Sequence, residues 1–411
     1  MIVDLLQDMR YAVRSLARKP GFTAVALVIL AVGIGGNTAI FSVVRSVVLR
    51  PLPFEEPDRL IQVRGRDLET GELGNLSPAD FMDFEREASS VQRMGANGWI
   101  GPATIVGADG TAERIGEVQV TEGFFPTLGV SPALGRVFTP EDDLPESDPV
   151  AILTDGLWRR SFGADPDIVG RSVVLDAVPT TVIGVLPPSY RHIEERTDRS
   201  AQIFTTHRFD RADPNRGGHF IRAVGRLVPG RSLEAARSEL GSIATRLEAR
   251  HPESNTNQGV AVVPLHDAAV GAAPSILWML LGATALILLV VCANLANLLL
   301  ASGAGREREL ALRSAVGAGR GRLVRQLVTE SAVLGLAGGA IGVLIAIAAS
   351  GPLSAVSAAG IPRADDIRVD GLVLGFAVAV TLVTSLGFGL FPALLLAPKR
   401  LSRHLGGNGA R

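Results

Sequence analysis

Charges of both signs are concentrated between residues 303 and 330, where they separate two long apolar runs. Leucines and a valine among these charges give a short apolar face, and Gly317-Ala318-Gly319 then breaks the helix before a second one begins near Arg320. A short charged helix standing clear of a membrane could dock a soluble partner. A solvated loop whose arginines only enforce topology explains the segment equally well. The residues concerned are Arg306, Glu307, Arg308, Glu309, Leu310, Leu312, Arg313 and Val316.

Residues with the usual catalytic or metal-binding spacing are not found elsewhere in the sequence. Five histidines between 192 and 266 show no H-E-x-x-H or related spacing, and no G-x-S-x-G sequence occurs. The two lysines, Lys19 and Lys399, precede Pro20 and Arg400, so neither belongs to a phosphate-binding P-loop. We therefore expect no catalytic residues, no metal and no cofactor on this chain, and no P-loop ATPase activity.

Composition excludes two further classes of protein. The formal net charge of −1 gives no general attraction to nucleic acid. The single cysteine, Cys292, excludes a disulfide-stapled secreted scaffold. With 47% hydrophobic residues over 411 positions, the chain has room for more than one domain.

Four uncharged apolar runs are each long enough to cross a bilayer, which needs about 20 residues. The first exceeds the roughly 7–15 apolar residues of a signal peptide and has no clear cleavage site, so we expect an uncleaved anchor. The sequence predicts an α-helical membrane protein with four transmembrane helices and a mixed α/β extracytoplasmic domain between the first two. The runs are 20–44, 268–305, 331–362 and 371–398.

The predicted organisation alternates membrane helices with segments on either side. Its boundaries are 1–19 for a cytosolic amphipathic helix, 20–48 for the first transmembrane helix, 49–270 for the external domain, 271–302 for the second helix, 303–330 for a cytosolic loop, 331–352 for the third helix, 353–370 for a short external loop, 371–397 for the fourth helix and 398–411 for a cytosolic tail.

Arginines and lysines near the ends of these helices predict the orientation. They cluster before residue 20, between 306 and 325, and after 398, which places both termini and the middle loop in the cytosol. Arg45 and Arg50 lie on the opposite side, but a long loop is translocated largely regardless of its charge.

Small and polar residues in the apolar runs predict helix packing. Gly335 and Gly339, and likewise Gly338 and Gly342, are four residues apart, a spacing that lets helix backbones approach closely. Asn294 and Asn297, one turn apart near the inner end of the second helix, predict hydrogen bonds between helices; a place on a substrate path is a less favoured alternative.

The external stretch predicts short strands rich in β-branched residues and two helices. Ser77-Pro78 begins one helix, and a second runs from about Ser232 to Ala249. The candidate strands are 60–64, 114–120, 150–154, 172–176, 180–186, 220–228 and 259–265.

Several segments, in order along the chain, resemble one family. The sequence E-R-E-L-A-L-R-S-A-V-G-A from Glu307, followed by L-V-T-E-S, is similar to the FtsX/MacB-type permease domain of ABC transporters. GFFPTLGVSPALG (123–135) and DGLWRRSFGADPDIVG (155–170) resemble its periplasmic core domain. The opening, 9–44, is closest to a duplicated permease branch known from acidobacteria.

The resemblance implies a location in the bacterial inner membrane, a periplasmic core domain and a separate ABC ATPase subunit that holds ATP and Mg²⁺. It also implies a second permease unit, as a homodimer or with a related chain, and it allows a periplasmic adaptor or outer-membrane channel. The family's ATPase-docking role is carried over to Arg306, Glu307, Arg308, Glu309, Leu310, Leu312, Arg313 and Gly317.

This chain departs from the family pattern in two respects. It lacks the ATPase domain of MacB-type proteins, and it has one permease unit where the duplicated branch has two. We expect a transport permease that converts ATP hydrolysis into movement of its periplasmic domain, for export or efflux. The alternatives are a non-transporting regulator that activates a periplasmic cell-wall hydrolase, and a membrane-anchored receptor without an ATPase.

Overall fold

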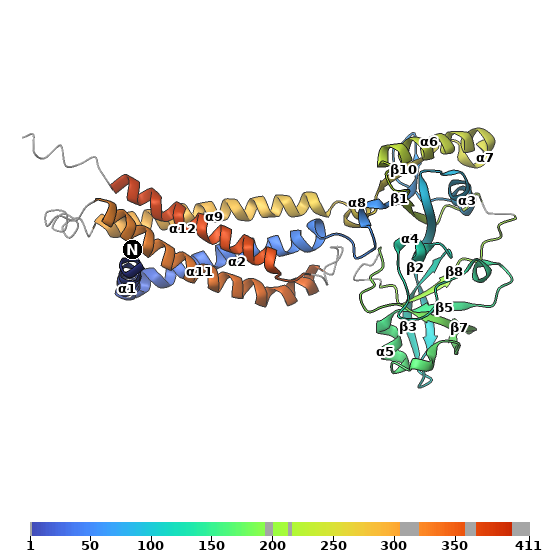
Figure 1. Cartoon of the computed structure of the whole chain (residues 1–411), viewed down its shortest axis with the longest axis horizontal. Helices are drawn as coiled ribbons and strands as arrows, with labels where there is room; N and C mark the ends of the chain where they lie inside the picture. Colours follow the sequence, from blue (N-terminus) through green and yellow to red (C-terminus); the bar gives the residue numbers. More distant parts are fainter. Residues whose placement is uncertain (1, 194–199, 213–215, 305–319, 358–366, 397–411) are drawn as a thin grey trace, which may run out of the picture. The chain divides into compact units, whose positions relative to one another are not determined.

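The computed structural model describes residues 2–193, 200–212, 216–304, 320–357 and 367–396. The chain forms two compact units, one made of residues 1–50 and 272–411 and the other of residues 51–271 (Figure 1). The described residues of the first unit include four helices that are long and apolar enough to cross a membrane. The second is a mixed α/β domain inserted between the first two of them, so the predicted fold class is confirmed.

Helix α1 (Ile2–Ala17) and helix α2 (Pro20–Val44) are separated by a break at the residue before Pro20. Proline tolerates the first helical turn but disfavours a helical residue before it, which explains the break. The Thr23 hydroxyl donates a hydrogen bond to the carbonyl of Leu16 at 2.8 Å and ties the two helices together. A π-helical segment, η1 (Arg45–Leu49), continues α2 to residue 49.

Helix α2 is the most enclosed of the four apolar helices, since half of its spanning window is buried. It packs against α9 (Ala273–Ala304), α11 (Arg320–Ser357) and α12 (Gly371–Leu396). The shared core contains Leu30, Ile34, Leu288, Leu334 and Phe388. By contrast, only 11% of the α9 window is buried, so most of this helix is exposed.

The inserted domain is built on a ten-stranded mixed sheet with the order β10-β1-β9-β2-β3-β8-β5-β7-β4, while β6 pairs with β2 and β7. Pairing is parallel between β3 and β8 and between β5 and β7, and antiparallel elsewhere. The strands are β1 (Leu60–Asp67), β2 (Val91–Val106), β3 (Ala112–Val120), β4 (Leu134–Gly135), β5 (Val150–Leu153), β6 (Ser172–Leu175), β7 (Val178–Val185), β8 (Ile203–Thr206), β9 (Arg222–Leu227) and β10 (Gln258–Pro264).

Helices cover the sheet at both ends of the domain (Figure 1). At one end α3 and α6 enclose a core with β1, β9 and the first half of β2. At the other end α5 packs on β5, β6 and β7. A third core between them contains Phe124, Phe125 and Phe204. The helices are η2 (Pro57–Arg59), α3 (Pro78–Glu87), α4 (Phe124–Leu128), η3 (Pro140–Asp143), α5 (Asp155–Phe162), η4 (Pro166–Ile168), α6 (Leu233–Arg250), α7 (Pro252–Asn255) and α8 (Leu265–Val270).

Both helices predicted in this domain are present with the expected N-caps. The Ser77 hydroxyl accepts a hydrogen bond from the Asp80 amide, and the Ser232 hydroxyl accepts one from the Ala235 amide. Each cap satisfies an amide that has no partner inside its helix. The seven predicted strands are also present, with ends shifted by a few residues.

Strand β2 is the main element that the sequence does not predict. It pairs with β9 through its first half and with β3 through its second, and the register shifts between Asn97 and Ile100. Glycine is required at Gly95, where a Cβ atom would lie 2.4 Å from the backbone nitrogen of Phe124. The bulge and this close approach let one bent strand connect the two ends of the domain.

Candidate functional site

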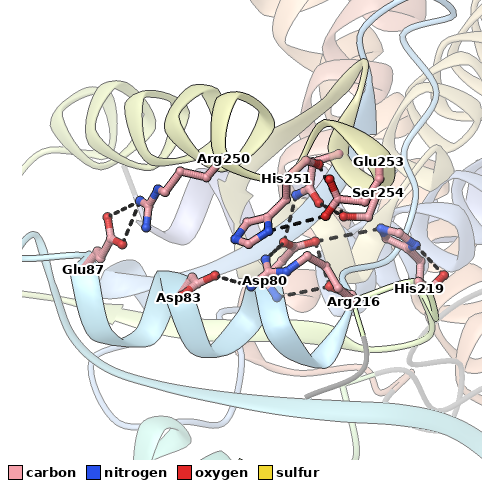
Figure 2. Close-up of polar contacts among 12 residues, drawn as sticks. Asp80, Asp83, Glu87, Arg216, His219, Arg250, His251, Glu253 and Ser254 are labelled. Atoms are coloured by element: carbon pink, nitrogen blue, oxygen red, sulfur yellow. Dashed lines mark hydrogen bonds and ion pairs between the residues drawn. The ribbon is translucent and has the colours of Figure 1, made fainter. Parts of the chain in front are cut away.

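A buried ion network links helix α3 to the segment that precedes β9 (Figure 2). Arg216 donates one guanidinium hydrogen bond to Asp80 and another to Asp83, each at 2.8 Å. The Asp80 carboxylate also accepts hydrogen bonds from Asn255 of α7 at 2.9 Å and from the Ser77 hydroxyl at 2.7 Å. Asp80 is 4% exposed, so its charge depends on these partners.

The same face of α3 is bound to α6 through Glu87. Arg246 donates to the Glu87 carboxylate at 2.7 Å, and Arg250 donates to it at 3.1 Å. These hydrogen bonds lower the pKa of Glu87. Figure 2 shows Arg250 meeting Glu87 at one end of α3, while Arg216 and His219 lie beside Asp80 toward the other end. The network fixes α3, α6, α7 and the segment before β9 as one block.

A second cluster of charges lies where α3, the end of β3, η3 and the segment after β8 meet. Arg211 donates to Glu122 at 2.9 Å, and another of its nitrogens is 3.6 Å from Glu85. Asp143 accepts a hydrogen bond from the Arg208 amide at 2.9 Å. Burial, and then a hydrogen bond with Glu122, raise the pKa of Asp143 to about 7. Asp143 therefore binds a proton at a pH where an ordinary aspartate is ionised.

Two histidines of the domain, the buried His192 and the half-buried His207, are neutral. Burial lowers the pKa of His207 to about 3, and burial together with the charge of Arg222 does the same for His192. The His207 ring stacks on Phe209 with centroids 4.5 Å apart, and the Tyr190 hydroxyl lies 3.3 Å from His192 Nδ1. In the described ranges, histidine, cysteine and acidic side chains form no group of three or more that could hold a metal ion.

The four predicted packing glycines lie on α11 and face two different helices. Gly338 and Gly342 face α2: a Cβ atom at Gly342 would lie 2.9 Å from the carbonyl oxygen of Ala31 and from the nitrogen of Gly35. Gly335 and Gly339 face α12, where a Cβ atom at Gly339 would lie 2.4 Å from the Thr381 hydroxyl. Helix α11 is thus in close contact with both neighbours.

A polar contact connects α2 and α9 within the apolar bundle. The Asn37 amide donates to the carbonyl of Thr284 at 3.0 Å, and the Thr284 hydroxyl donates to the Asn37 side chain at 3.2 Å. Asn294 and Asn297 are instead exposed on α9, and neither side chain makes a hydrogen bond to the described residues. The interhelical role predicted for these two residues stays a prediction.

Arg45, which directly follows the last residue of α2, has an acidic partner. Arg45 Nε lies 3.5 Å from Asp370 Oδ2, and the other Asp370 oxygen accepts hydrogen bonds at 3.0 Å from the Leu372 and Val373 amides at the start of α12. Arg45, whose position departs from the arginine distribution that predicts the orientation, is therefore paired with Asp370.

Comparison with known proteins decides the family. Residues 23–243 match the model of the MacB-like periplasmic core domain, which is more than half of the chain, and residues 281–399 match the FtsX-like permease C-terminal model. The chain belongs to the FtsX/MacB-type permease family. Its four apolar helices and periplasmic-type domain make this permease a multi-pass protein of the inner membrane.

Curated relatives of the permease include longer proteins. The macrolide export ATP-binding/permease protein MacB of Chromobacterium violaceum is 28% identical over 277 residues, which are 67% of this chain and 41% of that protein. The pyoverdine export ATP-binding/permease protein PvdT of Pseudomonas savastanoi pv. phaseolicola is 26% identical over 296 residues, 69% of this chain and 42% of that protein. The chain spans about two fifths of the length of these relatives.

Two solved structures are similar to the periplasmic part of the permease. The periplasmic region of MacB from Actinobacillus actinomycetemcomitans has a TM-score of 0.38 at 16% identity, covering 51% of this chain and 90% of that one. The extracellular domain of the noncanonic ABC-type transporter YknZ from Gram-positive bacteria has a TM-score of 0.37 at 16% identity, covering 49% and 99%.

The residues assigned by resemblance to ATPase docking, Arg306 to Gly317, lie outside the described residues. The structure describes the helices on either side of them, α9 as far as Ala304 and α11 from Arg320 onward. The docking role of the segment between them stays a prediction.

Sequence reasoning missed both charge clusters of the periplasmic domain. One signal was available, because Asp80, Asp83 and Glu87 have the i, i+3, i+7 spacing of a single helix face. An acidic face next to an apolar one indicates basic partners elsewhere in the chain. Nothing local marks Glu122 and Asp143, which the fold brings together from segments 21 residues apart in sequence.

Proposed function

We propose that this chain is the membrane subunit of an ABC transporter that exports a substrate by means of a separate ATPase. The observation that carries the proposal is the match of two permease family models, in order, on a chain with four apolar helices and an inserted periplasmic-type domain. The two relatives above are named for macrolide and pyoverdine export, which favours export over regulation of a hydrolase.

In this proposal ATP and Mg²⁺ bind to the partner ATPase. The sequence has two lysines among 40 basic residues and neither lies in a P-loop, so ATP binding requires residues beyond these 411. The charged segment 303–330 docks on the ATPase from the cytosolic side. Closure of the ATPase moves this segment, and its contact must differ between the two ATPase states for energy to be transmitted.

The helices next to the docking segment are suited to carry such a movement. Helices α9 and α11 run from its two ends across the apolar unit. Close backbone contact between α11 and α2 at Gly342 and Gly35 leaves little room for one helix to slide independently. The periplasmic domain is inserted between α2 and α9, so displacement of either helix reaches the domain through a covalent link.

Co-purification tests the proposal. Tagged full-length chain, extracted from its native membrane in mild detergent, is expected to bring down a P-loop ATPase whose hydrolysis rate rises in the complex. E309A/R313A is expected to reduce ATPase recovery. R231A/E234A is the matched control, because it removes the same two charges from exposed positions of the periplasmic domain. Absence of any ATPase, or equal recovery with both double variants, would show that the docking assignment is wrong.

A further inference from the structure

Three arginines of the periplasmic domain lie close together, one just before β1 and the others on the next two strands of the sheet. Arg226 of β9 is paired with Arg93 of β2 directly across the ladder, where like charges repel each other. Arg59, the last residue of η2, precedes β1. Burial, and then the charge of Arg59, lower the pKa of Arg226. The three guanidinium groups therefore favour the approach of negative charge.

The guanidinium of Arg226 is buried without a full set of acceptors. Arg226 is 8% exposed, and its Nε donates to the carbonyl of Thr127 at 3.0 Å. Its Nη2 donates to the carbonyl of Glu55 at 2.8 Å. The Nη1 atom is buried and has no hydrogen-bond partner among the described residues. Because a buried charged donor without an acceptor is unfavourable, an oxygen that reached Nη1 would be bound strongly.

Arg93 supplies a second guanidinium whose donors are available. Its side chain is exposed and makes no hydrogen bond or ion pair within the part of the chain that the structure describes. Directly paired residues of neighbouring strands have Cβ atoms about 4.5–5.5 Å apart, so one oxyanion can contact both Arg93 and Arg226. Arg59 is held beside them by hydrogen bonds to the Leu227 carbonyl at 3.0 Å and to Gln92 at 2.7 Å.

The carboxylate nearest to these arginines, that of Glu56, satisfies them only in part. It accepts a hydrogen bond from Arg59 Nη1, but it lies 3.6 Å from Arg226 Nη1, beyond hydrogen-bond distance. The Glu56 side chain is 55% exposed, and its backbone has the left-handed φ of 42° that a side chain disfavours. An exposed ion pair of this kind contributes little, so a stronger anion could displace Glu56 and free Arg59 Nη1.

We propose that Arg59, Arg93 and Arg226 form a binding site for a phosphate group, which displaces the carboxylate of Glu56. The charges of Glu55 and Glu56 both act on Arg226. Three positive charges against these two leave an excess of one, and release of Glu56 raises the excess to two. A phosphate monoester carries nearly two negative charges at pH 7 and has three acceptor oxygens, so it matches this excess better than a carboxylate does.

The site is next to the connection that enters the periplasmic domain from η1. Arg226 already holds this connection through the Glu55 carbonyl, and Leu52 anchors it in the core of the domain. A phosphate on the same guanidinium would fix the connection more firmly and stabilise the domain. The group can belong to a soluble compound or to a lipid headgroup, because both present the same oxygens. The site does not depend on the ATPase docking of the proposed function.

Thermal unfolding of the full-length protein in phosphatidylcholine nanodiscs, followed by tryptophan fluorescence, tests the site with inorganic phosphate as the probe. Sodium acetate and sodium chloride at matched ionic strength are the control salts. R93Q removes an exposed guanidinium without a partner in the described residues, so this variant should fold like the wild type. R114Q is the matched control, because Arg114 is also exposed on a strand and makes no ion pair with the described residues.

Phosphate is expected to raise the unfolding midpoint of the wild type and of R114Q until the site is saturated, and acetate is not. R93Q should weaken the apparent phosphate affinity by about tenfold, the scale of one charge-assisted hydrogen bond. E56Q should strengthen it several-fold, because the competing charge is removed. Equal phosphate responses of the wild type, R93Q and R114Q would indicate a general salt effect and overturn the proposal. Absence of a response from folded wild type, or weaker binding to E56Q, would also overturn it.

Nanodiscs that contain phosphatidic acid distinguish the two sources of the phosphate. If a lipid headgroup fills the site, the wild-type midpoint should be higher than that of R93Q before any phosphate is added, and added phosphate should raise it little further. If the ligand is a soluble compound, phosphatidic acid should leave the phosphate response of the wild type unchanged. Either result, together with the loss of affinity in R93Q, supports the site.

Discussion

Replacement of Gly35 by alanine tests the backbone contact at the centre of the membrane bundle. A Cβ atom at this position would lie 2.8 Å from the carbonyl oxygen and 3.2 Å from the Cα atom of Gly342. Both are backbone atoms, so no side chain can rotate away and α2 and α11 must separate. Gly36 is the control, because a Cβ atom there would meet nothing within 4 Å.

The size of the effect follows from two opposing contributions. Overpacking of a close contact costs about 1–3 kcal/mol. The change from glycine to alanine in a helix stabilises by up to about 1 kcal/mol, and this gain is common to both positions. G36A is therefore expected to be neutral or slightly stabilising, and G35A to be less stable than G36A by about 1–3 kcal/mol.

Thermal unfolding in detergent with a thiol-reactive dye measures this difference in the bundle alone. Cys292, the only thiol, is half-buried on α9 and packs against the shared core of the four helices. G35A is expected to expose it several degrees below G36A, at a scale of about 2–4 °C per kcal/mol. Equal unfolding midpoints for G35A and G36A would refute the close approach of α2 and α11. If adding G342A to G35A lowered the midpoint by as much again, the two substitutions would act independently, and this result would also refute the contact.

Three further predictions concern the periplasmic domain, and unfolding of the full-length protein followed by tryptophan fluorescence checks each. Because the folded pKa of Asp143 is raised from 3.8 to about 7, the contribution of this group to stability should fall by about 2 kcal/mol from pH 5 to pH 7, and D143N should remove this part of the slope; equal slopes for D143N and wild type would contradict the raised pKa. R216Q leaves buried Asp80 without its cation and should cost about 3 kcal/mol, with exposed R231Q as the neutral control. Burial raises the pKa of Glu239, but hydrogen bonds from Ser90 and Ser89 lower it to about 2. Because solvent screens this half-exposed carboxylate, E239Q should cost only about 1 kcal/mol at pH 7, and this difference should vanish as the pH falls below 4.5 towards 2.

The strands that could be predicted are those whose own residues favour extended structure. β-Branched residues make up half of Val150–Leu153 and most of Val178–Val185, and these strands are present. β2 escaped prediction because Gly95, Gly98 and Gly101 followed by Pro102 resemble turn sequences. Its extended conformation is imposed by pairing with two other strands. One is β9, which is distant in sequence, and the other is β3, whose register with β2 shifts at a bulge.

The candidate sites also divide into those that the local sequence marks and those that depend on the tertiary structure. The glycine spacing on α11 is visible in the sequence because i, i+4 positions share a helix face, although which neighbour each pair contacts is not. The partner of the acidic face of α3 is Arg216, more than 120 residues away, and no local pattern connects the two. The raised pKa of Asp143 depends on burial, which only the tertiary structure creates.

The two chain segments that enter and leave the periplasmic domain lead into neighbouring strands, and this has a mechanical consequence. β1 and β10 pair antiparallel from Ile61 with Pro264 to Asp67 with Gln258, and β10 is the edge of the sheet. Both connections to the apolar helices are therefore at the Ile61–Pro264 end of one ladder.

A force that parts these two connections would peel β1 from β10 one residue pair at a time, starting at Ile61 and Pro264. Because the seven pairs would open in turn, such a force would meet the resistance of one pair at each step and not that of the whole ladder. The edge strand β10 is therefore the part of the sheet most directly loaded when the two connections are drawn apart.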